Sequence, residues 1–171
     1  MWKSIKAYGR NAILLEWIQD IDYKTNQEIL TLAKKIEYSK IHGIVDVVPA
    51  YASLTIFYMP EIIAFTQLKK QITLIEGKHS YNFQHTGKVW EIDVLYHKKE
   101  QKDLVAISQY SGLSTDEIIE IHSSTEYSVY FIGFLPGFLY LGGLSEKLCV
   151  PRKSIPDLHI PAGSVAIGGA Q

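Results

Sequence analysis

Two side chains in the second half of the sequence have the chemistry to act in catalysis. His122 follows the apolar residues Ile118 and Ile121, so it comes at the end of an expected helix. An imidazole titrates near neutral pH and can act as a general base or a hydrogen-bond donor. The same position also suits a cation that interacts with the helix dipole. Arg152 can hold a carboxylate or phosphate through two parallel hydrogen bonds, or bond carbonyls of its own proline-rich loop.

Four further residues are predicted to contact a substrate. Gly163 and Ser164 lie in a Pro-Ala-Gly-Ser turn, where backbone amides and a hydroxyl can form an anion-binding nest. A plain tight turn before a strand has the same sequence pattern. Asp103 can bind a cationic or hydroxyl group, or it can cap a helix N-terminus. Gln171 can present its amide to a ligand or belong to a disordered end.

Other reactive side chains lack the surroundings that their chemistry needs. We assign no metal, because no ligand spacing relates the remaining histidines, among them His79, His85, His97 and His159. Cys149 lies between Leu148 and Val150, which is typical of a buried, inert thiol. The phosphate-binding motifs G-x-x-x-x-G-K-[ST] and G-x-G-x-x-G do not occur in the sequence. The chain alone is therefore not expected to cradle a nucleotide.

Composition indicates an ordinary globular protein. The 171 residues are 47% hydrophobic and 20% charged, and the formal net charge is −1. At about 150 residues per domain, this length allows one or two domains. The part up to Thr86 has ten basic and eight acidic residues, and the rest has seven and ten. Neither part has the excess of cations that binding to nucleic acid requires, so we expect no nucleic-acid partner.

The sequence favours a cytoplasmic location and no membrane span. A single cysteine cannot form an internal disulfide, which suits a reducing compartment, and no signal peptide is visible. The 18 residues from Tyr127 to Leu144 carry no charge, which is near the lower length limit for a spanning helix. However, four glycines and Pro136 interrupt this run. It is better read as a buried strand, a turn and a second buried segment.

The first part of the chain predicts the element order ββαββα. Alternating patterns indicate strands over 3–8, 12–17, 44–48 and 54–58. A capping box at Thr25 to Glu28 is expected to open a helix that ends near Ser39, with Gly43 as a stop. Pro60 suits the first position of a second helix that continues through Ile72. We expect a four-stranded antiparallel sheet with both helices on one face.

The second part predicts short helices and several strands. Alternation over 90–96 indicates a half-buried strand, and 104–110 a short helix that ends at Gly112. A capping box at Ser114 to Glu117 opens the helix that ends at His122. Strands are expected over 127–134 and from Ser164, and the prolines near the end favour a mostly β structure. The aromatic residues Phe131, Phe134, Phe138 and Tyr140 are expected to line its interior.

Four motifs resemble one known family in the same order along the chain. Residues 127–141 match Y-x-V-x-F-x-G-F-x-P-G-F-x-Y-L, and 43–54 match G-I-x-D-V-V-P-A-Y-x-S-L. Residues 151–152 match P-R, and 160–167 match V-P-A-G-S-V-A-I with isoleucine in the first place. The sequence is therefore similar to the family of 5-oxoprolinase B-subunits, also known as allophanate hydrolase subunit 1 and as the histidine-kinase inhibitor KipI.

The resemblance implies an α+β protein of two domains. Residues 1–78 would form an α/β sandwich, 79–87 a linker, and 88–171 a β-barrel like that of cyclophilin. The family pattern continues with T-G-I-Y-P and S-P-G-G-W elements, which the sequence lacks, so we expect the barrel to be incomplete at its C-terminus. His122 corresponds to the histidine of the family's H-x-x-x-x-Y pattern.

The resemblance also implies partners and an activity. The chain would bind tightly to the C-subunit of 5-oxoprolinase, and together with the A-subunit the complex would use ATP to convert 5-oxoproline to glutamate. ATP would be bound by the complex rather than by this chain. An alternative is a regulator that inhibits autophosphorylation of a sensor histidine kinase. Prolyl isomerase activity is a third reading, which rests on fold analogy alone.

Two departures from the family pattern bear on the substrate site. The family's Y-G-G-x-x-G-P-D-L is replaced by residues 96–104, which keep Tyr96, Asp103 and Leu104 but lose three glycines and the proline. Glycines allow the backbone to approach a ligand closely, so their loss predicts a remodelled loop. The family's second P-R is Pro156-Asp157 here, which exchanges a cation for an anion and weakens an anion site at that position.

Overall fold

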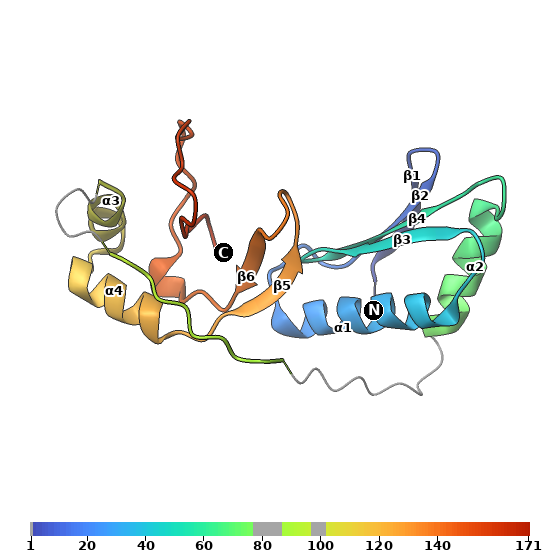
Figure 1. Ribbon diagram of the computed structural model, residues 1–171, viewed down its shortest axis with the longest axis horizontal. Helices are drawn as coiled ribbons and strands as arrows, with labels where there is room; N and C mark the ends of the chain where they lie inside the picture. Colours follow the sequence, from blue (N-terminus) through green and yellow to red (C-terminus); the bar gives the residue numbers. More distant parts are fainter. Residues whose placement is uncertain (1, 77–86, 97–101) are drawn as a thin grey trace.

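The first part of the protein is a four-stranded antiparallel sheet packed on two helices (Figure 1). The computed structural model describes residues 2–76, 87–96 and 102–171. The strands β1 (Ser4–Tyr8), β2 (Ala12–Glu16), β3 (Ile44–Pro49) and β4 (Ser53–Tyr58) lie in the order β1-β2-β4-β3, all antiparallel. The ββαββα prediction is confirmed for this part.

Alternating side chains of the sheet build the main core. Burial alternates strictly along β4, as expected for a strand with one face against helices. Helix α1 (Tyr23–Ser39) lies along the sheet, and α2 (Phe65–Glu76) contacts α1 near one end of the sheet (Figure 1). The fully buried side chains of this core include Ile13, Leu15, Ile29, Ile36, Leu54, Ile56, Leu68 and Ile72.

The start of α1 differs from the prediction. Asp22, and not Thr25, is the N-cap, and its carboxylate accepts a hydrogen bond of 2.7 Å from the Thr25 amide. The predicted capping box at Thr25 to Glu28 is therefore wrong. Asp22 precedes Thr25 by three residues, so α1 begins about one turn earlier than predicted.

The end of α1 and the start of α2 also differ from the prediction. Lys40 at φ 47° is the C-cap of α1, so Gly43 does not stop the helix. Gly43 instead lies under Ile63, where a Cβ would come within 2.8 Å of the Ile63 side chain. Residues 59–63 form a turn that buries Ile63, and α2 begins at Phe65 rather than at Pro60.

Where the structure describes it, the second part contains more helix than strand. Helices α3 (Lys102–Ser111) and α4 (Thr115–Ser124) precede a hairpin of β5 (Ser128–Ile132) and β6 (Leu139–Gly142) and a 3₁₀ turn, η1 (Glu146–Leu148). The capping box of α4 is confirmed, because the Ser114 hydroxyl accepts the Glu117 amide while Glu117 accepts the Ser114 amide at 2.8 Å. The predicted mostly β content is wrong.

No closed barrel is present in the residues that the structure describes. Residues 87–96 are extended but pair with no strand, and Trp90, Ile92 and Leu95 are exposed. The predicted strand from Ser164 is also absent, and only an isolated bridge joins Val150 to Gly169. A strand needs a hydrogen-bonded neighbour, and none lies beside these segments within the described ranges.

Two features of the predicted division lie outside the described residues. The linker over 79–87 is described only at Gly87, and the remodelled loop over 97–102 is described only at Lys102, the first residue of α3. Across the described ranges, no helix is both long and apolar enough to cross a membrane.

We expect Lys40→Gly to stabilise the protein. A non-glycine residue in the left-handed region costs about 1–2 kcal/mol, which glycine at position 40 would avoid. The greater freedom of glycine in the unfolded chain offsets part of this stabilisation. The free energy of unfolding in urea should rise by about 1 kcal/mol. Lys40→Ala removes the same side chain without relieving φ and serves as the control. Equal stability of the two variants would contradict this explanation.

Candidate functional site

His122 lies at the centre of a small polar cluster. It is in the last turn of α4, and its Nδ1 shares a short hydrogen bond with the Tyr96 hydroxyl. The Tyr127 hydroxyl donates to the His122 carbonyl at 3.2 Å, and the rings of Tyr96 and Tyr127 lie 5.9 and 5.4 Å from the imidazole. The cluster therefore joins the extended segment 87–96, α4 and the start of β5.

This cluster favours a neutral imidazole. Burial lowers the pKa of His122, and burial likewise raises the pKa of the Tyr96 phenol. A tyrosine hydroxyl that donates to Nδ1 requires the imidazole proton to be on Nε2. Thr125 already satisfies the helix end, because its hydroxyl donates to the Ile121 carbonyl at 2.7 Å. The geometry thus provides a neutral imidazole that can donate a hydrogen bond from Nε2, and it can act as a base only when Tyr96 releases Nδ1.

Arg152 and Gln171 are brought to the same short stretch of backbone. Arg152 packs over Gly168, where a Cβ would lie 3.4 Å from its Nε. The Gly168 amide donates to the Gln171 carbonyl at 2.8 Å, and the Gly169 amide donates to Val150 at 2.8 Å. These two hydrogen bonds hold Gly168 and Gly169, which lie beside Arg152, close to Gln171 and to Val150.

The other predicted ligands are engaged within the protein. The amide and the hydroxyl of Ser164 both donate to the Pro161 carbonyl, at 3.2 and 2.7 Å, and the Gly163 turn is exposed. Asp103 lies in the first turn of α3 and accepts from Lys153 at 2.7 Å. Lys153 also donates to Asp157, so the anion that replaces the family's arginine is neutralised locally. In the described ranges, the six predicted residues do not form one connected site.

Sequence reasoning missed the residues that join the two parts of the protein. Tyr51, between β3 and β4, donates its hydroxyl to the Leu141 carbonyl of β6 at 3.0 Å. Its ring makes edge contacts with three aromatic rings of the β5–β6 hairpin, Tyr130, Phe131 and Tyr140. The Asn26 amide of α1 donates to the Tyr130 carbonyl at 3.2 Å. Tyr51 lies inside a motif matched in the sequence, which is the signal that could have identified it.

The environment of Tyr51 keeps it protonated. Burial, followed by the nearby phenols of Tyr140 and Tyr130, raises its pKa to about 12, although Arg152 acts in the opposite direction. Tyr51 is therefore a hydrogen-bond donor and not a base at physiological pH. Gly142 completes this contact, because a Cβ there would lie 2.2 Å from the Tyr130 ring.

Among the described residues, two buried polar atoms of the core have no hydrogen-bond partner. They are Oδ1 of Asn26, which is completely buried, and Nε1 of Trp17. An unsatisfied buried polar group costs about 1–3 kcal/mol. Asn26 is therefore not explained by stability alone. Its amide group fixes how α1 meets β5.

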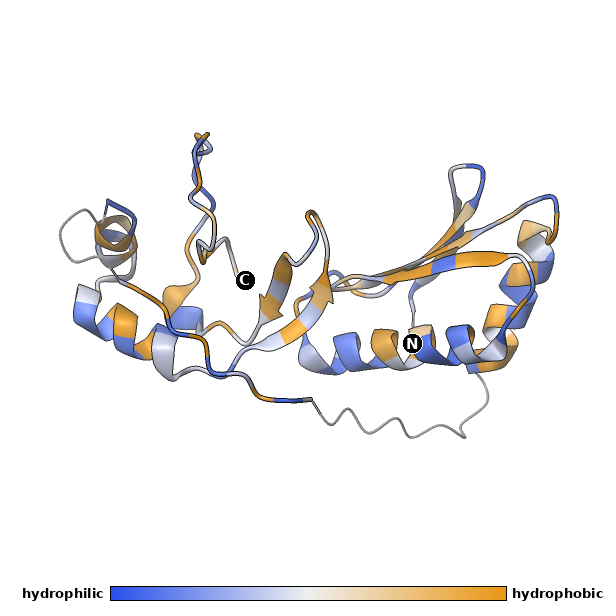
Figure 2. Ribbon diagram, viewed as in Figure 1, coloured by the Kyte–Doolittle hydropathy of each residue, from blue (hydrophilic) through white to orange (hydrophobic). Residues whose placement is uncertain are grey.

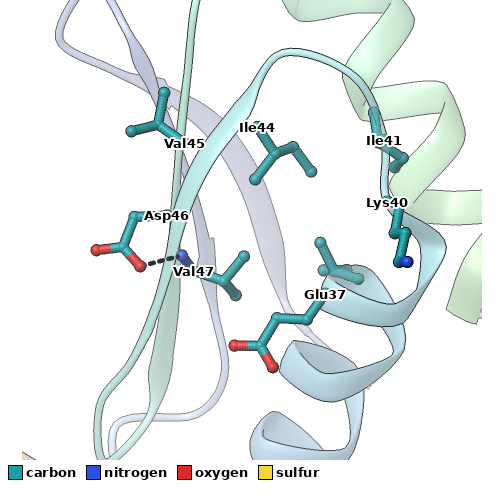
Figure 3. Close-up of a pocket in the computed structure, with 8 residues that line it drawn as sticks. Glu37, Lys40, Ile41, Ile44, Val45, Asp46 and Val47 are labelled. Carbon is teal, nitrogen blue, oxygen red and sulfur yellow. Dashed lines mark hydrogen bonds between the residues drawn. The ribbon is translucent and has the colours of Figure 1, made fainter.

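A separate surface pocket of about 240 Å³ lies between α1 and β3 (Figure 3). Its floor is apolar, with Ile36 and Val47 buried, and Glu37, Lys40 and Asp46 lie at its rim. The Asp46 carboxylate accepts a hydrogen bond of 2.8 Å from the Val47 amide. This bond protects β3, an edge strand of the sheet, against pairing with a further strand. The pocket is smaller than the roughly 300 Å³ at which small-molecule sites begin, and none of the predicted site residues lines it.

Metal chemistry has no evident support in the described part of the chain. No group of three or more His, Cys, Asp or Glu side chains there could hold a metal ion. The acidic residues that do meet, Asp103 and Asp157, are bound to Lys153.

Sequence comparisons identify a family model and named relatives. The model described as carboxyltransferase domain, subdomain C and D, matches residues 3–171. The 5-oxoprolinase B-subunit of Bacillus subtilis (strain 168) is 33% identical, over 98% of this chain and 74% of that protein. That of Escherichia coli O157:H7 is 34% identical, over 95% and 73%, and that of Haemophilus influenzae is 38% identical, over 98% and 77%.

Solved structures support the arrangement of the chain. The crystal structure of TTHA0988 superimposes with a TM-score of 0.77 at 28% identity, over 95% of this chain and 30% of that one. The chain thus spans less than a third of that protein. Kluyveromyces lactis urea carboxylase has a TM-score of 0.55 at 14% identity, over 81% of this chain and 14% of that one, which shows a similar fold only.

We expect His122 to make stability depend on pH. Because burial lowers its pKa below the ordinary 6.5, the unfolded chain binds a proton first as the pH falls. The free energy of unfolding should decrease below about pH 6.5 and level off below the folded pKa. His122→Asn retains an acceptor for Tyr96 and should reduce this dependence, measured by urea unfolding between about pH 5.5 and 7.5.

The control for this prediction is His159→Asn. His159 is exposed, so its replacement should leave the pH dependence as in the wild type. A His122→Asn variant with the same pH dependence as the wild type would show that the imidazole is not held neutral.

We expect Tyr51→Phe to lower the free energy of unfolding by about 1 kcal/mol, because it removes the hydrogen bond from the hydroxyl to the Leu141 carbonyl. The ring contacts remain. Tyr110→Phe, at a side chain that is 64% exposed, is the matched control and should change stability by less than about 0.5 kcal/mol. Thermal and urea unfolding measure both, and equal effects of the two variants would refute the role of the hydroxyl.

Proposed function

Because this chain belongs to the family of carboxyltransferase domains, subdomain C and D, we propose that it is the B-subunit of an ATP-dependent 5-oxoprolinase. The observation that carries the proposal is 33–38% identity to three proteins that carry the name of the 5-oxoprolinase B-subunit, over 95–98% of this chain. The complex would also contain the A- and C-subunits and convert 5-oxoproline to glutamate. Its location would be the cytoplasm.

The described residues fit a role at an interface rather than a complete active site. Opening of a lactam with ATP requires phosphorylation of the amide oxygen and then attack by water. The amide and hydroxyl of Ser164 are both bound to Pro161, so that turn offers no phosphate cradle in this state. The chain by itself does not fit a nucleotide, and we assign ATP to the assembled complex.

Within that complex, His122 would be the hydrogen-bond donor nearest the reacting groups through Nε2, or their base once the Tyr96 hydroxyl leaves Nδ1. Arg152 would bind a substrate carboxylate bidentately, with Gln171 nearby. Gly163 would contribute to substrate binding from its exposed turn, and Ser164 and Asp103 would do so after their present hydrogen bonds exchange. The C-subunit would supply the neighbouring surface.

The domain organisation is part of the same proposal. Residues 1–78 would form one domain and 88–171 a cyclophilin-like barrel once its extended segments gain strand partners. The exposed apolar side chains of Trp90, Ile92 and Leu95 support this, because an alternating strand normally buries one face. The similar structure of TTHA0988 supports the relative arrangement of the elements.

A second candidate is the regulator of a sensor histidine kinase. It is favoured by the departure of residues 96–104 from the family pattern, because loss of the glycines alters a ligand loop while leaving the rest of the surface intact. Such a regulator would bind a kinase and have no turnover.

The two candidates are separated by activity of the assembled protein. We expect co-expression with the A- and C-subunit homologues of the same genome to give a complex with 5-oxoproline-dependent formation of ADP and glutamate. His122→Ala should reduce this rate about 100-fold or more, as for loss of a group that donates or accepts a proton in the reaction, with His159→Ala as control. A purified complex without this activity, or recovery of a histidine kinase in place of the two expected partners, would contradict the oxoprolinase proposal.

A further inference from the structure

The Tyr96 hydroxyl is the donor in its hydrogen bond with His122. Within the described ranges this phenol makes no other hydrogen bond, so Nδ1 is the acceptor available to its proton. Burial raises the pKa of Tyr96, which keeps the phenol protonated at neutral pH. A phenol is a stronger acid than the N–H of a neutral imidazole, and it is therefore the better donor. The bond leaves Nδ1 unprotonated and places the imidazole proton on Nε2.

Among the described residues, no charged group competes with this bond for control of His122. The titratable groups that face the imidazole are two phenols, Tyr96 from the extended segment and Tyr127 immediately before β5. Burial raises the pKa of Tyr127 as well, so both phenols are neutral. Burial is also the cause of the lowered pKa of His122. The tautomer of the imidazole therefore depends on the hydrogen bond from Tyr96.

The orientation of the imidazole is restrained from two segments of the chain. The extended segment 87–96 passes across α4, where the ring of Tyr96 meets the imidazole at an interplanar angle of 84° (Figure 2). From the other segment, Tyr127 contacts the imidazole with its ring and donates its hydroxyl to the His122 carbonyl at 3.2 Å. The side chain and the backbone of His122 are thus held by different tyrosines.

The aromatic rings of the second part are placed differently from the prediction. Phe134 and Phe138 are 81% and 44% exposed, so the expectation that they line an interior is wrong. Tyr96 and Tyr127 instead contact a polar side chain that is partly buried. A hydrogen bond in such partly apolar surroundings is stronger than in water, which favours one tautomer over a mixture of both.

The proton on Nε2 is available to another molecule. Nε2 has no hydrogen-bond partner among the described residues, and it is not one of their buried unpaired atoms. A neutral imidazole with a free N–H can polarise an oxygen of a substrate as a hydrogen-bond donor. Because Nδ1 is already bonded to Tyr96, the same imidazole has no free lone pair with which to act as a base.

We propose that Tyr96 is a positioning residue that commits His122 to the Nε2–H tautomer, so that His122 acts as a hydrogen-bond donor and not as a base. The acceptor would be a substrate oxygen on which negative charge develops during the reaction. This inference rests on the proposed function, which supplies the substrate. It assigns a role to Tyr96 and decides between the two roles open to the imidazole.

Nitrogen NMR of the full chain tests the tautomer without any partner. In long-range ¹H–¹⁵N spectra of the histidine rings, recorded above the ordinary imidazole pKa of about 6.5, His122 should show a protonated Nε2 and an unprotonated Nδ1. The signals that are lost in His122→Asn identify it. Tyr96→Phe keeps the ring and removes the donor to Nδ1, so both nitrogen shifts should move toward the tautomer mixture of free histidine.

Tyr127→Phe is the matched control for the spectra. It also removes a hydroxyl that bonds His122, but one that binds the backbone carbonyl and not the ring. It should leave both nitrogen shifts as in the wild type. A proton on Nδ1 in the wild type, unchanged shifts in Tyr96→Phe, or equal changes in the two variants would each overturn the inference.

Turnover of the assembled complex tests the donor role. Tyr96→Phe should lower kcat about tenfold with little change in KM, as for an interaction that acts in the transition state. Glutamine can donate a hydrogen bond but cannot take up a proton as a base, so His122→Gln should retain at least about tenfold more activity than His122→Ala. Tyr110→Phe, at an exposed side chain of α3, should turn over as the wild type does.

The outcomes separate this inference from the function on which it rests. An active complex in which His122→Gln is as slow as His122→Ala, or in which Tyr96→Phe is as fast as the wild type, overturns the inference and leaves the proposed function standing. A purified complex without 5-oxoproline-dependent turnover overturns the proposed function and the donor role with it, whichever tautomer the spectra show.

Discussion

The structure depends on one contact, in which Tyr51 and Asn26 hold the β5–β6 hairpin against the first part of the protein. The Tyr51 hydroxyl binds Leu141, 90 positions away in sequence, and the Asn26 amide binds Tyr130, 104 positions away. Both acceptors are backbone carbonyls on the two strands of one hairpin. Because Tyr51 and Asn26 bind the main chain of the hairpin, its position does not depend on what its exposed side chains contact.

This contact explains features that otherwise have no common cause. Asn26 is retained in a core with one unpaired oxygen because its amide specifies where β5 lies. Tyr51 is buried enough for its pKa to reach about 12, so it stays a donor. The hairpin, supported from one side, then presents Phe134 on the other.

Local patterns predicted most of the first part and little of the second. The strands around Ile13 and Ile56 could be predicted because alternation of burial is written in neighbouring residues. The start of α1 differs from the prediction because Asp and Thr both suit an N-cap, and residue type does not distinguish Asp22 from Thr25. The alternation at 90–96 predicts a half-buried strand, which is wrong for the described structure, because a strand also needs a partner that local sequence cannot supply.

The candidate site shows the same limit. The imidazole of His122 was identified by residue type, but Tyr96 lies 26 positions earlier, and their hydrogen bond exists only in three dimensions. Likewise, Lys153 was not singled out, although it neutralises both Asp103 and Asp157. Pairing of this kind cannot be derived from spacing.

Hydrogen–deuterium exchange of residues 128–142 in Tyr51→Ala, compared with the wild type, tests most directly whether Tyr51 holds the hairpin. The account predicts faster exchange in β5 and β6 while the β1-β2-β4-β3 sheet remains protected. Unchanged exchange in the hairpin would show that it is held by other contacts, and would contradict the account.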